Sequence, residues 1–243
     1  MGVRITRLRG VARAVLVHLY TASGVLLALF VAMELAAPSP DPRRVFLALA
    51  AAVVIDATDG TLARRWEVKR VLPTIDGRTI DDIVDYLTYV FLPLLLIWRM
   101  GWVPAPSWVA VAPALVASLF GFANTGAKDE AGGFFLGFPS YWNVVAFYAG
   151  FIHRLYGPWV NAAILLLLAL LTVLPVRFLY PNLAPRPWRG PVVAGAIVWL
   201  GVMLWLLGDY PQAPAPLVWA SLLYPAFYIG LSLYLGRAPW AAR

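Results

Sequence analysis

The sequence predicts an all-α, polytopic integral membrane protein, a bundle of about eight transmembrane helices with an N-terminal amphipathic helix. Two observations predict this class. Of the 243 residues, 62% are hydrophobic and 13% are charged, and the mean hydropathy is +0.77. A soluble domain has about a quarter of its residues charged. The apolar residues also fall in blocks of roughly twenty, the length that crosses about 30 Å of hydrocarbon. The composition therefore excludes a soluble globular enzyme and a disordered chain.

The N-terminal segment 3–13 mixes basic and apolar side chains. Its basic residues are Arg4, Arg7, Arg9 and Arg13. This pattern predicts a short amphipathic helix on an anionic membrane surface, and an ordinary basic flank of the first span is the alternative. The apolar run 14–36 comes next. Because this run is long for a signal peptide and further spans follow it, we interpret it as a retained first span.

Seven further apolar blocks predict seven further spans. Their ranges are about 44–62, 79–98, 105–127, 139–153, 157–179, 191–208 and 215–236. The block at 139–153 is short and has polar flanks, so six spans remain the alternative to eight. The chain contains no internal repeat and no low-complexity segment, which predicts a single membrane domain over residues 1–243.

The basic residues are distributed unevenly between the two sides of the predicted bundle. With eight spans, 15 of the 19 Lys and Arg residues fall on the side that carries both termini, and 4 fall on the other side. Cytoplasmic segments carry the excess of Lys and Arg, so both termini are expected in the cytoplasm. The net charge of +7 thus reflects membrane topology, and nucleic acid is not expected as a partner.

The residues available for chemistry are restricted. Cysteine is absent, which excludes disulfides, thiolate metal sites and a cysteine nucleophile. The two histidines, His18 and His153, are far apart in the chain. A histidine-rich metal site and a Ser–His–Asp hydrolase therefore have little support.

The acidic residues gather in one segment. Seven of the 12 lie within residues 56–85, and five of these seven lie on predicted spans. Four of the five form two pairs at helical spacing, Asp56 with Asp59 and Asp81 with Asp85, and the fifth is Asp82. An aspartate within a span costs roughly 3 kcal/mol unless it is paired, and it marks a functional site by default.

The spacing of these four aspartates predicts that they converge. Asp56 and Asp59 are three residues apart and Asp81 and Asp85 are four apart, so each pair shares one helix face. The second and third spans are joined by a short cytoplasmic loop, so they run antiparallel and their cytoplasmic ends are neighbours. Four carboxylates at one depth repel one another unless a cation is bound, and all-oxygen ligands select Mg²⁺ or Mn²⁺.

Two alternatives and one extension accompany this interpretation. The aspartates can instead form plain ion pairs with Arg64, Arg65 and Arg78.

Small residues beside the cluster leave room for a ligand close to the helix, and Arg64 can pair with a phosphate at the cytoplasmic interface. The small residues are Gly60, Ala63 and Gly77. Together with a metal, these residues indicate a nucleoside diphosphate site. The alternative class of function is a cation transporter with intramembrane carboxylates.

The order of these residues resembles the signature of the CDP-alcohol phosphatidyltransferases, integral membrane enzymes of phospholipid synthesis. The first part reads Asp56-Ala-Thr-Asp59-Gly60-Thr-Leu-Ala63-Arg64, and after twelve residues the second reads Gly77-Arg-Thr-Ile-Asp81-Asp-Ile-Val-Asp85. The usual family member has eight residues between these parts. The longer interval of twelve residues resembles that of the bacterial phosphatidylcholine synthase branch. Two further segments resemble that branch: 85–93 and 134–143.

The resemblance implies a role for each residue of the signature. Asp56, Asp59 and Asp81 bind metal, and Asp85 lies at the same site as the general base, or as a plain metal ligand. The resemblance also implies two bound ions, Mn²⁺ or Mg²⁺. The CDP group is lined by Gly60, Ala63, Arg64 and Gly77. Asp82 lies outside the signature and receives no role.

The reaction that this branch implies is transfer of a phosphatidyl group from CDP-diacylglycerol to choline, with release of CMP. Related enzymes that use serine, inositol or glycerol phosphate are the alternative. Choline carries three methyl groups on its ammonium, so aromatic faces with a nearby carboxylate suit it. The candidates are Tyr86, Tyr89, Phe134, Phe135, Tyr141, Trp142 and Tyr148.

The resemblance also implies where the protein works and with what. It is expected in the bacterial inner membrane, as a multi-pass protein whose active site faces the cytoplasm. The expected partners are CDP-diacylglycerol, choline and membrane lipids, and homodimer formation is left open.

Overall fold

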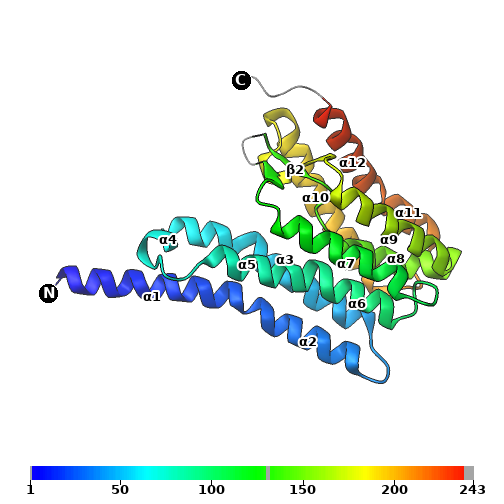
Figure 1. Cartoon of the computed structure of the whole chain (residues 1–243), viewed down its shortest axis with the longest axis horizontal. Coiled ribbons are helices and arrows are strands. Elements are labelled where there is room, and N and C mark those ends of the chain that lie inside the picture. Colours follow the sequence, from blue (N-terminus) through cyan, green and yellow to red (C-terminus); the bar gives the residue numbers. More distant parts are fainter. Residues whose placement is uncertain (1, 130–131, 238–243) are drawn as a thin grey trace. The chain divides into compact units, whose positions relative to one another are not determined.

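A computed structural model describes residues 2–129 and 132–237 of the chain. These residues form two compact units, and the division falls between Pro93 and Leu94, inside a helix. Both units consist mainly of helices (Figure 1). The prediction of one membrane domain over the whole chain stays a prediction.

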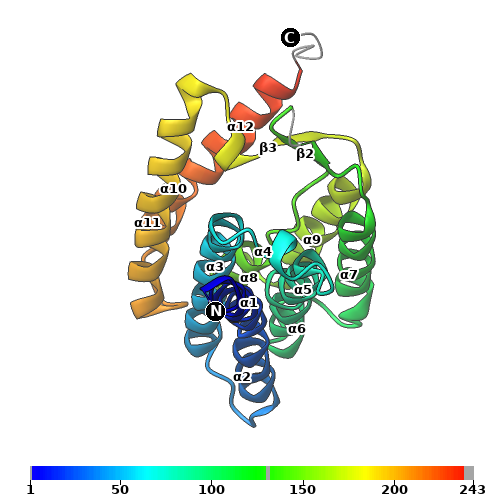
Figure 2. The same ribbon diagram turned by 90° about the vertical axis from the view of Figure 1, so that its left-hand side faces the viewer.

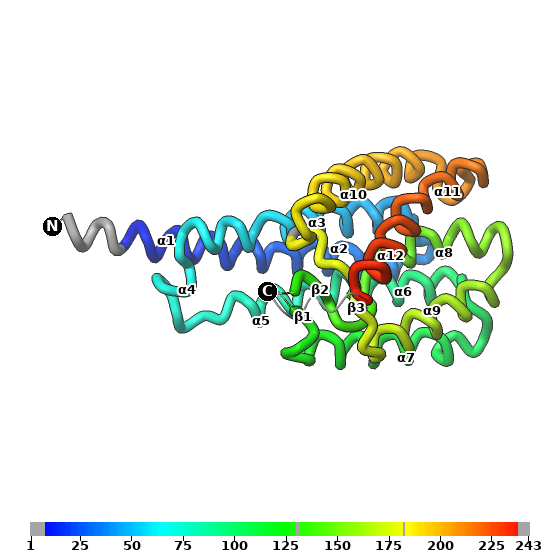
Figure 3. The backbone as a smooth tube through the Cα atoms, turned by 90° about the horizontal axis from the view of Figure 1, so that it is seen from above, coloured from blue at the N-terminus to red at the C-terminus, as the bar shows by residue number. Residues whose placement is uncertain are grey.

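The first unit contains the acidic segment. Its elements are α1 (Gly2–Ala22), α2 (Gly24–Ala36), α3 (Pro42–Arg65), α4 (Val68–Val71), α5 (Gly77–Asp85), the π-helical turn η1 (Tyr86–Phe91) and the beginning of α6 (Leu92–Arg99). Helices α1 and α2 follow each other, and α3 runs back along both of them (Figure 3). Helix α5 also contacts α1 and α2, as the view along the helices shows (Figure 2).

The two helices that carry the aspartates begin at aspartate caps. Asp41 precedes α3 and accepts a hydrogen bond from a backbone N–H of its first turn, and Pro42 follows at the position where proline is favoured. Asp76 caps α5 in the same way. The hydroxyl of Thr79, at 2.8 Å, and the backbone N–H of Arg78, at 3.1 Å, donate to Asp76 and lower the pKa of its carboxyl group. Both caps thus mark where the two helices start.

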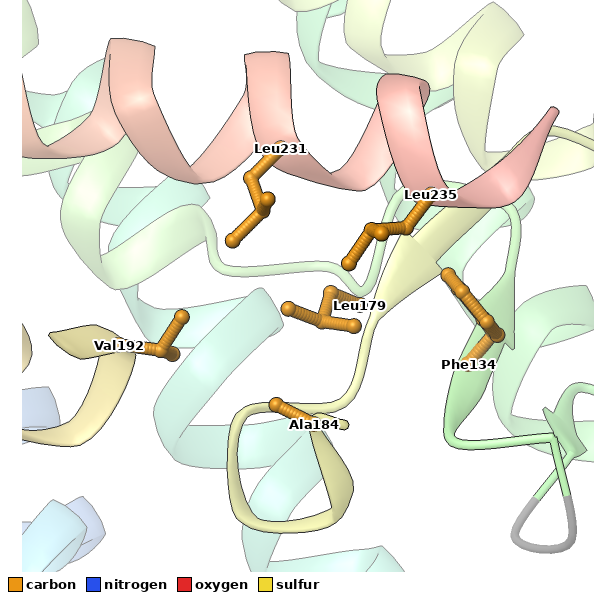
Figure 4. Packing of buried hydrophobic residues seen from close by; sticks show 6 residues of the cluster. All are labelled: Phe134, Leu179, Ala184, Val192, Leu231 and Leu235. Atoms are coloured by element: carbon orange, nitrogen blue, oxygen red, sulfur yellow. The ribbon is translucent and has the colours of Figure 1, made fainter. Parts of the chain in front are cut away.

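The second unit contains the remaining helices and three short strands. Its elements are α7 (Trp108–Ala123), β1 (Lys128–Asp129), β2 (Phe134–Leu136), α8 (Trp142–Tyr156), α9 (Pro158–Val173), β3 (Arg177–Leu179), η2 (Pro181–Leu183), α10 (Arg186–Leu206), η3 (Leu207–Asp209), α11 (Ala215–Ser221) and α12 (Leu223–Gly236). The strands form an antiparallel sheet in the order β1-β2-β3. A hydrophobic cluster joins this sheet to α10 and α12 (Figure 4). It consists of Phe134, Leu179, Ala184, Val192, Leu231 and Leu235.

The all-α prediction is confirmed in its coarse form, although three short strands lie among the helices of the second unit. The predicted span 157–179 is wrong at its end, because α9 stops at Val173 and residues 177–179 form β3. Pro175 is the physical reason, since proline lacks an N–H and disfavours the helical conformation of the residue before it. The apolar run across this proline gave no sign of the change, because short apolar runs do not distinguish strand from helix.

The membrane prediction is confirmed in its coarse form. Among the described residues, four helical stretches are long and apolar enough to cross a membrane. They are Leu8–Ala36, Pro42–Arg65, Arg186–Asp209 and Ala215–Gly236. Two shorter apolar helices, α7 and α9, lie within two further predicted spans. The chain is therefore a helical membrane protein, while the number of eight spans stays a prediction.

The N-terminal segment is helical, as predicted. Helix α1 runs without interruption from Gly2 into the first apolar block, so the basic segment and the span begin as one helix. Arg9 and Arg13 are exposed. The side chains of Arg4 and Arg7, and the whole of Arg243, lie outside the described residues. The contact of this helix with a membrane surface stays a prediction.

Candidate active site

Three of the four predicted aspartates come together in the first unit. One carboxylate oxygen each from Asp56 on α3 and from Asp81 and Asp85 on α5 lie within 4.8 Å of one another. All three side chains are partly buried. The convergence that the helical spacing predicted is therefore present for these residues.

The fourth aspartate, Asp59, is placed differently. It is 6% exposed, and it lies outside the group of three oxygens found in the described part of the chain. The hydroxyl of Thr21 on α1 donates to its Oδ2 at 2.7 Å. Asp59 is one helical turn along α3 from Asp56, so it faces the same side of the helix but is held by a different neighbour.

A tyrosine hydroxyl reaches the group of three. Tyr89 donates to Oδ2 of Asp56 at 2.7 Å. Tyr89 belongs to η1, the π-helical turn that begins directly after Asp85. Such turns are rare in proteins, and those that occur are often found at functional sites. Tyr86, the first residue of η1, is also partly buried. Two of the aromatic residues suggested for choline thus lie on the same helical segment as Asp81 and Asp85.

The residues predicted to line the CDP group lie on α3 and at the start of α5. Arg64 is exposed, and its Nη2 donates to Oγ1 of Thr61 at 3.2 Å. Its guanidinium group also lies over Gly60, where a side-chain carbon would be 3.3 Å from Nη1. Ala63 is partly buried. Arg64 is therefore positioned along the small residues of the signature and accessible to an anionic ligand.

Gly77 has a neighbour that the sequence did not indicate. A side-chain carbon at Gly77 would lie 2.9 Å from Cε1 of His18 on α1. His18 is 8% exposed, and its Nε2 has no hydrogen-bond partner among the described residues. Glycine is needed at this position for the close approach of the imidazole. No sequence signal linked His18 to the signature, because it lies 59 residues away on another helix.

Asp82, the aspartate without a role in the signature, has a local partner. Its Oδ2 lies 3.6 Å from Nε of Arg78, four residues earlier on the exposed side of α5. An exposed pair of this spacing contributes only about 0.3–0.5 kcal/mol. Arg78, one of the alternative partners of the signature aspartates, thus pairs with Asp82.

The other aromatic candidates lie in the second unit. Trp142 is fully buried at 0% exposure, and its Nε1 donates to Oγ of Ser118 at 2.6 Å. Phe138 packs edge-on against both Tyr141 and Trp142. Tyr148 is also buried, and its hydroxyl is hydrogen-bonded to Ser221. Trp142 and Tyr148 therefore belong to the core of this unit.

The observed donor set fits a hard divalent cation. Three carboxylate oxygens within 4.8 Å can share one ion, and Mg²⁺ and Mn²⁺ prefer such oxygen ligands. Asp59 adds a buried carboxylate that has no ion pair with a basic side chain in the described part of the chain. Buried charge of this kind requires compensation, which a cation supplies.

Comparison with known proteins gives one consistent result. The phosphatidylcholine synthase of Pseudomonas aeruginosa is 39% identical over 234 residues, which cover 94% of this chain and 94% of that protein. The phosphatidylcholine synthases of Legionella pneumophila and Agrobacterium fabrum are each 34% identical, over 90% and 91% of this chain and 86% and 88% of their own length.

The chain belongs to the phosphatidylcholine synthase family. The alignment with the Pseudomonas aeruginosa protein extends over nearly the whole chain, so membership in the phosphatidylcholine synthase family applies to both compact units. A scan against models of protein families found no match. The resemblance drawn from the signature and from segments 85–93 and 134–143 is thus confirmed at the level of the phosphatidylcholine synthase family.

Proposed function

We propose that this protein transfers the phosphatidyl group of CDP-diacylglycerol to choline and releases CMP. The observation that carries this function is the cluster of Asp56, Asp81 and Asp85, built on the signature of a chain that is 39% identical to a phosphatidylcholine synthase over nearly its whole length. The cluster supplies a place for a diphosphate with its cation, and the family membership supplies the acceptor.

The four signature aspartates would hold the cation. Asp56, Asp81 and Asp85 form the group that fits one ion, and Asp59 would contribute to a second one beside it. When bound, Mg²⁺ or Mn²⁺ neutralises the diphosphate and stabilises the departing phosphate of CMP. Asp59 is buried on the same face of α3, which supports its assignment as a ligand.

Asp85 is the proposed general base. An alcohol is a poor nucleophile at neutral pH, so a base must remove its proton as it attacks. The choline oxygen forms a bond to the β-phosphorus, and the bond from that phosphorus to the bridging oxygen breaks. The proton passes to Asp85, and CMP leaves with the electron pair. Asp85 lies one turn further along α5 than Asp81, and the nucleotide would lie toward the start of that helix.

The nucleotide would lie along the small residues of the signature. Gly60 and Ala63 leave room on α3, and the accessible guanidinium group of Arg64 pairs with a phosphate oxygen. Gly77 would close the other side of the CDP group from the start of α5. The exposure of Arg64 and its place over Gly60 support this assignment.

Choline would contact Tyr89 and Tyr86. The ring of Tyr89 is held beside Asp56 by the hydrogen bond of its hydroxyl, so an aromatic face and carboxylates are close together. A trimethylammonium group is attracted by both. This arrangement favours the two tyrosines of η1 over Trp142, whose side chain is enclosed in the core of the second unit.

The proposed setting is the bacterial inner membrane, crossed eight times, with the active site toward the cytoplasm. Release of CMP from CDP-diacylglycerol tests the proposal, with choline, serine, inositol, glycerol 3-phosphate and ethanolamine offered separately to the purified protein and Mn²⁺. We expect rapid release with choline alone. Equal release with serine or ethanolamine would overturn the choline assignment, and no release with any alcohol would overturn the transferase.

A further inference from the structure

Helix α1 brings a polar side chain, that of Thr21, against an aspartate of the signature. Thr21 is 7% exposed and lies at the end of α1, near its junction with α2. Its hydroxyl is 2.7 Å from Oδ2 of Asp59. The two residues are 38 positions apart, and both are buried.

The hydroxyl proton of Thr21 is directed at the carboxylate. A threonine in a helix often donates to the carbonyl four residues earlier, and here the carbonyl oxygen of Val17 is 3.4 Å away. The oxygen of Asp59 is closer by 0.7 Å, and hydrogen bonds to a charged acceptor are the stronger ones. The single hydroxyl proton therefore belongs to the bond with Asp59.

This bond fixes one oxygen of Asp59 and leaves the other for a ligand. Oδ2 accepts from Thr21, while Oδ1 has no hydrogen bond within residues 2–129 and 132–237. A carboxylate that binds a metal is usually oriented by a hydrogen bond of this kind, and loss of the orienting partner weakens metal binding. The neighbouring pair, Tyr20 and Thr58, joins the same two helices at 2.8 Å without touching an aspartate.

We propose that Thr21 is a positioning residue that orients Asp59 for metal binding, so that α1 is part of the metal site. The inference rests on the proposed function, because that function makes Asp59 a ligand. Thr21 touches neither CDP-diacylglycerol nor choline in this scheme. Its contribution is to hold one carboxylate oxygen so that the other faces the cation.

Binding of Mn²⁺ to the purified full-length protein tests this role without turnover. Electron paramagnetic resonance measures the free Mn²⁺ that remains at each concentration of protein. Thr21→Val keeps the shape of the side chain and removes the hydroxyl, and we expect it to weaken Mn²⁺ binding about tenfold. Thr21→Ser keeps the hydroxyl and should bind within about twofold of the wild type, which is below the effect expected for a lost orienting bond.

Tyr20→Phe is the matched control, because it removes the other hydroxyl that joins α1 to α3. We expect it to bind Mn²⁺ like the wild type. If Tyr20→Phe and Thr21→Val weaken binding equally, Thr21 only joins two helices and the inference is overturned. Unchanged binding by Thr21→Val overturns it too.

Asp59→Asn separates this inference from the proposed function. Weak binding by Asp59→Asn and normal binding by Thr21→Val would leave Asp59 as a ligand and remove the role of Thr21. Normal binding by Asp59→Asn would remove Asp59 from the metal site and the inference with it. Absence of choline-dependent CMP release, with Mn²⁺ binding that follows the expected order of variants, would overturn the function alone.

Discussion

The hydroxyl of Tyr89 donates to Oδ2 of Asp56 at 2.7 Å, which joins the π-helical turn η1 to the member of the carboxylate cluster that lies on α3. This contact gives one residue two separable properties. Its hydroxyl can orient Asp56, and its ring can face a substrate beside the carboxylates. Substitutions that remove one property at a time distinguish the two.

Tyr89→Phe and Tyr89→Leu are expected to affect different kinetic parameters. Phenylalanine keeps the ring, so the KM for choline should stay close to that of the wild type while more Mn²⁺ is needed for activity. Leucine removes the ring, and loss of a desolvated cation–π contact of about 2 kcal/mol should raise the KM for choline roughly thirtyfold. Initial rates of CMP release over a range of choline concentrations give both values.

The KM for CDP-diacylglycerol serves as the control in the same assay. It should change little in either variant, because Gly60, Ala63, Arg64 and Gly77 are proposed to hold the nucleotide. A rise in the KM for choline that is equal in Tyr89→Phe and Tyr89→Leu would contradict a role for the ring.

The metal prediction has a matched pair of variants in adjacent residues. Asp81→Asn should abolish CMP release while the protein stays folded, because removing one charge from a repulsive cluster does not destabilise the helix pair. Asp82→Asn should keep nearly full activity, since Asp82 pairs with Arg78 on the exposed side. Release of CMP with EDTA, and again with added Mn²⁺ or Mg²⁺, measures the requirement directly. Full turnover in excess EDTA is the result that would rule out the metal.

Much of the site could be predicted from local spacing. The i, i+3 and i, i+4 intervals place Asp56 with Asp59 and Asp81 with Asp85, and a short loop brings the two helices together. Those rules describe single helices and their immediate neighbours. They are sufficient for the group of three carboxylates that the structure contains.

The contacts of α1 could not be predicted in this way. Thr21 and His18 lie 38 and 59 residues from their partners, Asp59 and Gly77. The apolar pattern of residues 14–36 predicts a span but not the direction in which its few polar side chains point. Only the packing of α1 against α3 and α5 determines that direction. Trp142 is a similar case, because a tryptophan near a predicted span end fits an interfacial belt as well as a core.

Trp142 is now expected to affect stability more than substrate binding. It is fully buried, and its removal leaves Oγ of Ser118 without the indole donor. Trp142→Leu should lower the free energy of unfolding by about 2–4 kcal/mol. Thermal melting of the purified protein, followed by circular dichroism, measures this change. Normal melting combined with a raised KM for choline would instead identify Trp142 as part of the choline site.

Gly77 is expected to tolerate substitution by alanine only when His18 is replaced by a smaller residue. The added carbon would lie 2.9 Å from Cε1 of His18, and His18 is only 8% exposed. Overpacking of this kind costs about 1–3 kcal/mol. Gly77→Ala should therefore melt at a lower temperature, and the double variant with His18→Ala should recover part of the loss. If the decreases in melting temperature of Gly77→Ala and His18→Ala simply add in the double variant, Gly77 is needed for a reason other than its contact with His18.

The absence of cysteine makes the membrane orientation directly testable, because single introduced thiols can be labelled without background. Ser39 lies between α2 and α3 and Thr74 between α4 and α5, and both are exposed. The excess of Lys and Arg on one side predicts that Ser39→Cys faces the periplasm and Thr74→Cys the cytoplasm. In cells with a permeabilised outer membrane, a maleimide that cannot cross the inner membrane should label the first variant and not the second.

Arg237→Cys should behave like Thr74→Cys if the number of spans is even. Labelling of Arg237→Cys from the periplasm would mean an odd number, and the short block at 139–153 would then be the first to lose its assignment as a span.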